Sequence, residues 1–198
     1  MSDSTVNLAT LIGSRICHDL ISPVGAITNG LELLEMSGSM DGPELELISD
    51  SVQNAGARIR FFRIAYGMAS DQMLGRLEVT SVLKDISAGG RLRFDWRPDA
   101  PHPRALVRLA FLALQCCETA MPYGGDVSID IVDDRWIIKG TTSKLNLELS
   151  LWRGLLPDFN ATDVTPAQVQ FVLFPSAARE LGRDIRLDHD ETSVTIAF

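Results

Sequence analysis

The chain has 198 residues and a formal net charge of −8, and 45% of its residues are hydrophobic. This length allows one large domain or two small ones with a sizeable core, and the acidic balance argues against a nucleic-acid-binding protein, which normally presents a basic face. The N-terminus lacks a signal-peptide pattern, and the most apolar run, residues 106–114, is too short to span a membrane. Three cysteines, two of them adjacent, are not typical of a secreted disulfide framework. We therefore expect a cytoplasmic protein that binds neither nucleic acid nor membrane.

The first predicted element is one long helix over residues 5–36. Its apolar residues recur at spacings of three and four, as one face of a helix requires: Leu8, Ile12, Ile16, Leu20, Val24, Ile27, Leu31 and Leu34. Pro23 lies inside this pattern and is expected to kink the helix without ending it, because the apolar stripe continues on both sides. Residues 37–43 are rich in turn-forming residues. A second helix is expected from Pro43, which suits a first helical turn, to the high sixties.

Two long amphipathic helices joined by a short turn form an antiparallel hairpin. A lone hairpin cannot cover both of its apolar faces, whereas two hairpins can do so by pairing into a four-helix bundle. The simplest expectation is therefore a homodimer. The alternative is that the C-terminal half folds back over the hairpin.

Beyond about residue 78, helices and strands are mixed. Helices are predicted over 80–87, 103–120 and 166–181, strands over 91–96, 127–131, 135–139, 185–188 and 194–198, and an ambiguous strand or short helix over 145–156. This order indicates an α/β sandwich. The expected fold class is α+β, with a helical hairpin domain over residues 1–77 and an α/β domain over residues 78–198.

His18 is the main candidate for a functional residue. At about 100° per residue, it points away from the apolar stripe of the first helix and therefore towards solvent. An exposed imidazole can act as a nucleophile in phosphoryl transfer if one ring nitrogen is free and an acceptor holds the proton on the other. Asp19 can supply that acceptor, and Ser22, one turn later, can contact a phosphoryl oxygen or a water.

The segment from Ile16 to Ile27, ICHDLISPVGAI, resembles the H-box of dimeric sensor histidine kinases. In that motif, a phosphorylated histidine is followed directly by an acidic residue and five positions later by proline, which correspond to His18, Asp19 and Pro23. Ser22 stands where kinases with phosphatase activity tend to carry threonine or asparagine.

The C-terminal half resembles a kinase ATP-binding domain that has lost its nucleotide motifs. The helix before the turn Pro122-Tyr-Gly-Gly125 would carry two asparagines that hold Mg²⁺ and nucleotide, yet those positions are Leu112 and Cys116. Neither residue suits Mg²⁺, which prefers oxygen ligands. The Asp-x-Gly-x-Gly motif is missing after the second strand, where residues 137–142 read IIKGTT, and no Gly-x-Gly lid precedes Pro166.

An intact histidine combined with a degenerate ATP-binding domain resembles the ChpT-type histidine phosphotransferases of alphaproteobacteria. This resemblance implies a homodimer that binds no ATP and relays phosphate through phospho-His18 between receiver domains of a hybrid kinase and of response regulators. No cofactor is implied, and Mg²⁺ is expected to come with the receiver. The catalytic residues would be His18, Asp19 and Ser22. The residues expected to contact the receiver are Ser14, Arg15, Ile21, Gly25, Asn29, Arg58 and Arg63.

Three other hypotheses are less consistent with the sequence. The His18-Asp19 pair could belong to a metal-dependent hydrolase, but the other histidines, His102 and His189, are expected in solvated loops. The cluster of Arg58, Arg60 and Arg63 on the second helix could form an ordinary solvated helix face rather than meet an acidic receiver. The whole protein could also be a non-catalytic regulator that occupies a receiver, and a genuine kinase is the least favoured.

Overall fold

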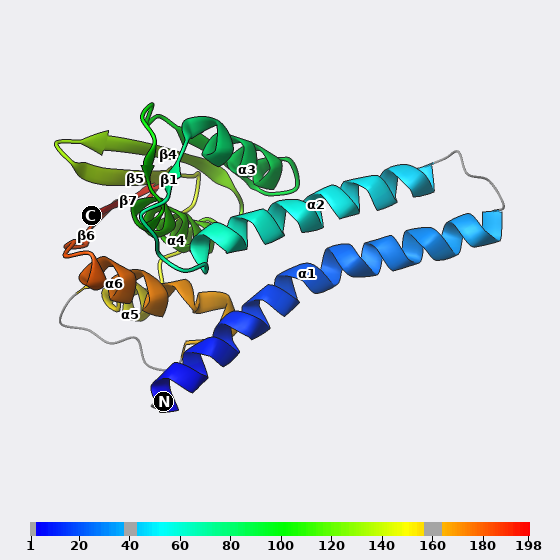
Figure 1. Cartoon of the computed structure of the whole chain (residues 1–198), viewed down its shortest axis with the longest axis horizontal. Helices are drawn as coiled ribbons and strands as arrows, with labels where there is room; N and C mark the ends of the chain where they lie inside the picture. Colours follow the sequence, from blue (N-terminus) through cyan, green and yellow to red (C-terminus); the bar gives the residue numbers. More distant parts are fainter. Residues whose placement is uncertain (1–2, 38–42, 157–163) are drawn as a thin grey trace.

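The computed structural model describes residues 3–37, 43–156 and 164–198. Its two longest helices, α1 (Asp3–Ser37) and α2 (Pro43–Ala65), form the predicted antiparallel hairpin, which projects from an α/β domain (Figure 1). Helix α1 continues through Pro23 and changes direction near its middle (Figure 1), as expected for a proline within a helix. The turn predicted over 37–43 lies largely outside the described residues.

The two arms of the hairpin approach each other closely where α1 carries a glycine. A Cβ atom on Gly30 would meet Cγ1 of Ile48 in α2 at 2.5 Å, which is too close for any larger residue. Pro23 and Gly30 are the buried residues of this half of α1. Their seven-residue separation places both on the same face, towards α2.

The α/β domain is built on a five-stranded sheet in the order β2-β4-β5-β7-β6. Its strands are β2 (Leu92–Trp96), β4 (Gly125–Val132), β5 (Arg135–Thr141), β6 (Arg186–His189) and β7 (Ser193–Ala197). Strands β2 and β4 are parallel, and the other pairs are antiparallel. Asp133 and Asp134 join β4 to β5 with φ values of 50° and 61°, as a tight two-residue hairpin turn requires. The predicted hairpin is thus confirmed.

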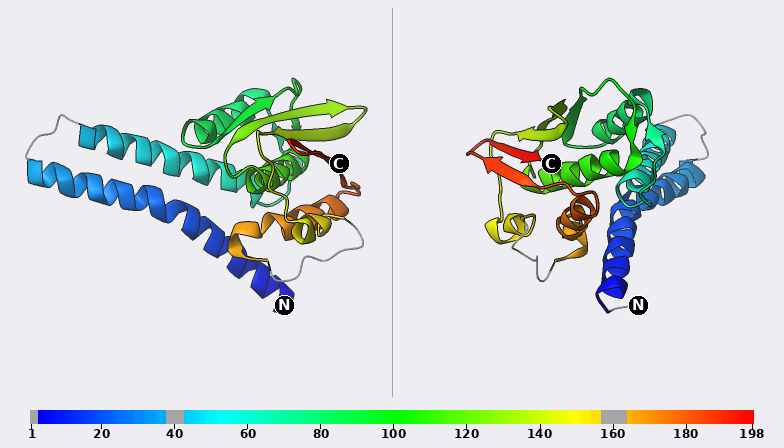
Figure 2. Two further views of the ribbon diagram at one scale, coloured as in Figure 1. Left: turned by 180° about the vertical axis from the view of Figure 1, so that it is seen from behind. Right: turned by 60° about the vertical axis from the view of Figure 1, so that its left-hand side comes forward.

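Helices α3 (Arg76–Ala88), α4 (Arg104–Ala120) and α6 (Gln170–Glu180) complete the domain, with the short helix α5 (Leu149–Arg153) and the 3-10 turn η1 (Pro166–Gln168) before α6. Helix α4 packs against β4, β5 and β7 of the sheet and against α6 on its other side (Figure 2). It is buried around most of its circumference. The fold class, N-terminal helices followed by an α/β domain, is therefore as predicted.

The hydrophobic core extends from the sheet to the base of the hairpin. Trp96, Trp136 and Trp152 are all buried, and the C-terminal end of α2 adds Phe61 and Phe62 to the same cluster. The N-terminal half of α1 adds partly buried side chains: Leu8, Leu11, Ile12 and Ile16. The C-terminal half thus covers only the base of the hairpin, and the arms beyond it lack this cover (Figure 1).

Several local predictions differ from the structure. Residues 145–148 form no strand, although the short helix expected within 145–156 is present as α5. Two unpredicted two-residue strands, β1 (Met73–Leu74) and β3 (His102–Pro103), pair with each other. His102 is therefore not in a solvated loop: its partly buried ring lies edge-on to Trp136 at 5.0 Å, and burial lowers its pKa.

Among the described residues, no helix combines the length and apolar character needed to cross a membrane.

Candidate functional site

His18 lies on the outer face of α1, and its side chain is 79% exposed. Its Nδ1 atom is 3.1 Å from Oδ1 of Asp19. An ionised carboxylate only accepts hydrogen bonds, so a hydrogen bond at this contact requires the imidazole proton on Nδ1 and leaves the lone pair of Nε2 free. The structure therefore brings His18 and Asp19 together in the arrangement that nucleophilic phosphoryl transfer requires.

Small and apolar exposed residues surround the imidazole on the same helix. Ser22 and Gly25 follow His18 by one and two turns, and Ser14 precedes it by one turn; all three are exposed. Asn29 is exposed further along this face. Ile21, at the edge of the face and three residues after His18, is 72% exposed. Among the residues that the structure describes, a Cβ atom on Gly25 would meet nothing within 4 Å, so packing within this part of the chain does not require a glycine there. The face is open to the approach of another protein.

Asp19 points away from solvent, towards the junction of the hairpin and the α/β domain. Its side chain is only 10% exposed, and its Oδ2 atom accepts a hydrogen bond of 2.8 Å from Nε of Arg15, one turn earlier in α1. Nη1 of Arg58, in α2, is 3.6 Å from the same oxygen. The two oxygens of one carboxylate thus have separate partners: His18 on one side and two guanidinium groups on the other.

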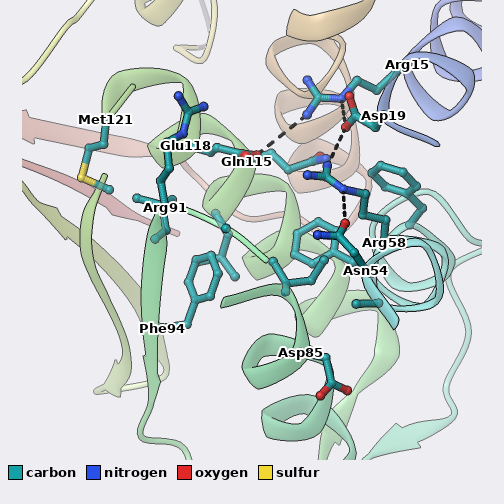
Figure 3. Close-up of a pocket in the computed structure, with 17 residues that line it drawn as sticks. Arg15, Asp19, Asn54, Arg58, Asp85, Arg91, Phe94, Gln115, Glu118 and Met121 are labelled. Atoms are coloured by element: carbon teal, nitrogen blue, oxygen red, sulfur yellow. Dashed lines mark hydrogen bonds and ion pairs between the residues drawn. The ribbon is translucent and has the colours of Figure 1, made fainter. Parts of the chain in front are cut away.

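Both arginines are held in turn by other parts of the chain (Figure 3). Arg15 donates a hydrogen bond of 2.7 Å from Nη1 to the carbonyl oxygen of Ala167 in η1, and its Nη2 lies 3.8 Å from Oε2 of Glu118 in α4. Nε of Arg58 donates to Oδ1 of Asn54 at 3.0 Å. Sequence periodicity did not reveal this network, because Glu118 and Ala167 are distant in the chain.

These contacts change the expected roles of two arginines. Arg15 and Arg58 were expected on the partner-facing surface, but their side chains are only 11% and 31% exposed and point inward. Arg63 is exposed, as expected. Arg60, next to them in α2, is paired with Asp85 of α3 at 2.7 Å.

A pocket lies beneath Asp19, between the hairpin and the α/β domain (Figure 3). Its walls combine the charged groups of the network with apolar side chains: Phe61, Phe62, Ile86, Leu92, Phe94 and Leu114. Gln115, also in the wall, donates a hydrogen bond of 2.9 Å to the hydroxyl of Tyr66. Burial raises the pKa of Tyr66 to about 12, so this phenol is neutral at physiological pH.

Comparison with known proteins assigns the chain to a family. The family described as histidine phosphotransferase C-terminal domain matches residues 76–193. The protein phosphotransferase ChpT of Brucella abortus (strain 2308) is 37% identical over an alignment of 142 residues that covers 68% of this chain and 68% of that protein. The chain belongs to the histidine phosphotransferase family. As such, it takes part in phosphotransfer within a phosphorelay.

A solved structure agrees with this assignment. A structure described as that of a bacterial phosphotransferase aligns over 100% of this chain and 98% of its own, with a TM-score of 0.80 and 29% sequence identity. The Acinetobacter baumannii histidine kinase AdeS aligns over 91% of this chain and 96% of its own, with a TM-score of 0.44 and 14% identity. The first alignment includes the helical hairpin that carries His18, whereas the family match begins after it.

In this histidine phosphotransferase, the two positions at which the kinase resemblance places asparagines lie inside the core. Leu112 and Cys116 are both 0% exposed, and burial raises the pKa of the Cys116 thiol well above its usual value. The segment after β5 packs inward as well: Trp152 of α5 is 4% exposed and lies edge-on to Phe171 of α6 at 5.4 Å. Across residues 3–37, 43–156 and 164–198, no three His, Cys, Asp or Glu side chains cluster as metal ligands would.

Proposed function

We propose that the chain relays phosphoryl groups between receiver-domain aspartates through phospho-His18. The observation that carries this proposal is the exposed imidazole whose Nδ1 lies 3.1 Å from Asp19, because this leaves Nε2 free on an open helix face. Membership of the histidine phosphotransferase family and the resemblance of the surrounding segment to an H-box support it. The expected location in the cytoplasm is a prediction.

The transfer step follows from this geometry. The lone pair of Nε2 attacks the phosphorus of a receiver aspartyl phosphate, the P–N bond forms, and the P–O bond to the receiver carboxylate breaks. The ring keeps its proton on Nδ1 and becomes cationic, and the Asp19 carboxylate stabilises that charge as it develops. The reverse reaction regenerates neutral His18 when a second receiver aspartate accepts the phosphoryl group. Mg²⁺ would come with the receiver and would stabilise negative charge on the transferred group. Ser22, one helical turn after His18, would contact a phosphoryl oxygen or a water.

The surface around His18 fits a receiver domain of a hybrid kinase or of a response regulator. Ser14, Ser22 and Gly25 present little bulk, so a partner backbone can come close to the imidazole. Ile21 supplies an apolar contact at the edge of this face, and Asn29 a polar one. Arg63 on α2 is available to an acidic partner surface.

Substitution of the histidine tests the proposal directly. With a phosphorylated receiver as donor, the wild-type protein should acquire acid-labile label, whereas His18→Ala should acquire none and keep its fold, because His18 packs against no core residue. His189→Ala is the matched control, since His189 is an exposed histidine at the end of β6. Label on His18→Ala would place the acceptor elsewhere. Receiver binding without any transfer to the wild type would instead identify a non-catalytic regulator.

We further propose that the protein is a homodimer. An apolar stripe runs along each arm of the hairpin: Val24 and Leu31 on α1 are 53% and 50% exposed, and Leu45, Val52 and Ile59 on α2 are 48%, 52% and 47% exposed. The residues on α2 are spaced by seven, which is the repeat of a helix-bundle seam. Two copies can bury these stripes against each other in a four-helix bundle while each His18 stays outside.

We also propose that the protein uses no ATP. Leu112 and Cys116 are buried and offer no oxygen ligand, which supports this proposal. The inward packing of α5 supports the same proposal, because the Trp152 side chain of α5 packs into the core against Phe171 of α6. Phosphoryl groups would therefore reach His18 only from another phosphorylated protein.

A further inference from the structure

We propose that Arg15 and Arg58 are positioning residues that hold the Asp19 carboxylate against His18, and that the α/β domain holds Arg15 in place through Glu118 and the carbonyl of Ala167. The inference rests on the proposed function of His18 and deepens it. It gives the domain that resembles a degenerate ATPase a role in phosphotransfer although His18 lies outside that domain, on α1.

The orientation of Asp19 is not fixed by α1 alone. Asp19 follows His18 directly, so the two residues leave the helix about 100° apart. Contact between them depends on the Asp19 rotamer that directs Oδ1 back towards the ring. In this rotamer, Oδ2 points at the guanidinium groups of Arg15 and Arg58, at 2.8 and 3.6 Å. Removing either guanidinium would free the carboxylate to rotate away from the imidazole.

Arg15 links the reacting helix to the α/β domain. Its guanidinium uses three nitrogens for three partners: Nε for Asp19, Nη1 for the Ala167 carbonyl and Nη2 for Glu118. Lysine cannot reproduce this, because its ammonium is a single point of donation, whereas the guanidinium is a rigid planar fork. With 11% of its side chain exposed, Arg15 is also shielded from the water that would compete for these contacts.

Arg58 supports the same carboxylate from the other arm of the hairpin. Its Nε is held by Asn54, one turn earlier in α2, which aims the Nη1 atom at Asp19. The carboxylate next to the nucleophile is thus fixed by groups from α1 and α2 and, through Arg15, from α4 and η1. A relative movement of the hairpin and the α/β domain would therefore alter the hydrogen bond to the imidazole.

The test compares transfer rates with the state of the His18 ring. In rapid-quench assays with a phosphorylated receiver, we expect Arg15→Gln and Arg58→Gln to lower the transfer rate by about 10-fold to 10²-fold, as misplacement of a catalytic group does. Arg15→Lys should recover part of the rate. Glu118→Gln should lower it by roughly two- to fivefold, since Glu118 is partly exposed and its contact is longer. Receiver affinity should not change in any of these variants.

A purely structural role would not affect the ring, so the second readout is nitrogen NMR of His18 in the full chain. We expect the Nδ1-protonated tautomer to dominate in the wild type and to give way to a mixture in Arg15→Gln, Arg58→Gln and Asp19→Asn. Arg93→Gln, which removes an exposed arginine paired with Asp126 on the sheet, is the control and should change neither readout. Glu118→Gln keeps the size of a half-exposed side chain, so it tests the domain link if the arginine variants fail to fold.

The outcomes separate the two proposals. If the wild type accepts no phosphoryl group, the proposed function fails. If the wild type transfers normally and all of these arginine and glutamate variants keep its rate and tautomer, the proposed function survives and the positioning role of Arg15 and Arg58 is wrong. If only Glu118→Gln behaves like the wild type, the arginines position Asp19 without help from this α4 carboxylate, which overturns the domain link through Glu118.

Discussion

At the scale of single residues, Cys116 and Cys117 make the stability of this protein sensitive to alkaline pH. Both thiols are fully buried, and burial raises the pKa of Cys117 to about 12 and that of Cys116 well above its usual value. In the unfolded chain, both thiols would ionise near pH 8.5. Above that pH, the unfolded state gains stability by losing protons that the folded state keeps, so the free energy of unfolding should fall.

The expected loss is about 1.4 kcal/mol per pH unit for each buried thiol. Urea denaturation at pH 7, 9 and 10 would measure this loss. Replacing both buried cysteines by alanine should lower the stability at pH 7, because it leaves cavities, but should flatten its decline above pH 8.5. Cys17→Ala, at an exposed position on α1, is the control and should keep the wild-type slope. An equal slope in the buried-cysteine variant would contradict the burial of these thiols.

Sequence alone could predict the exposed side of the site but not its buried side. His18 lies opposite the apolar stripe of one helix, and helical periodicity is a local property that the sequence carries. The inward orientation of the Arg15 side chain depends instead on a contact with Ala167, which is 152 residues away in the chain. The inward orientation of the Arg58 side chain depends on the packing of α2 against α1. Helical spacing cannot distinguish an arginine on a solvated face from one at the junction of two domains, so both were placed on the partner-facing surface.

At the scale of helices and strands, the long periodic helices and the strands of four or more residues were predicted, whereas the two-residue strands were not. Helices α1, α2 and α4 carry apolar residues at helical spacing over several turns, and the β4-β5 hairpin carries an Asp-Asp turn between alternating strands. Strands β1 and β3 have two residues each, which is too short for any period to appear. Residues 145–148 alternate like a strand, but the hydrogen bonds from Leu145 to Glu191 and from Asn146 to Ala120 hold them beside the sheet without strand pairing.

The packing of α4 and α5 leads to a prediction about nucleotide. Because Leu112 and Cys116 lie in the core and Trp152 is part of the packing against α6, we expect Mg-ATP at millimolar concentration to give no saturable heat in calorimetry. We expect no incorporation of label from γ-labelled ATP at His18. The double variant Leu112→Asn and Cys116→Asn should not gain binding, and should lose roughly 1–3 kcal/mol of stability for each buried amide without a partner. Saturable binding of ATP by the wild type would overturn the proposal that phosphate arrives only from another protein.

At the scale of the whole molecule, the hairpin has two different environments along its length. Near its base, the α/β domain covers it and fixes the network around Asp19. Beyond that base, apolar side chains such as Leu31 on α1 and Leu45 on α2 are exposed, because the domain lies at the other end of the hairpin (Figure 1). The simplest expectation from the sequence was a dimer, and the alternative was that the C-terminal half folds back over the hairpin. In the structure, the domain covers only the base of the hairpin. The remaining exposed stripe is therefore what a second copy would have to bury.

The stripe gives the prediction about assembly. Val24 and Leu31 on α1 and Leu45, Val52 and Ile59 on α2 would form a larger continuous apolar surface than a soluble monomer usually presents. We expect light scattering at micromolar concentration to give the mass of a dimer for the wild type. Ile59→Glu should give a monomer, because two charges would be buried at the seam.

Leu77→Glu is the matched control for the assembly test. Leu77 is 86% exposed, but it lies on α3 outside the stripe, so this variant should stay dimeric. The rate of transfer to His18 should fall in Ile59→Glu. Without the second copy, the helices of the partner hairpin no longer pack against α1 and α2, and α1 is held less firmly. A wild-type monomer would show that the exposed stripe is not a dimer interface. A dimer that persists in Ile59→Glu would show that the copies associate through another surface.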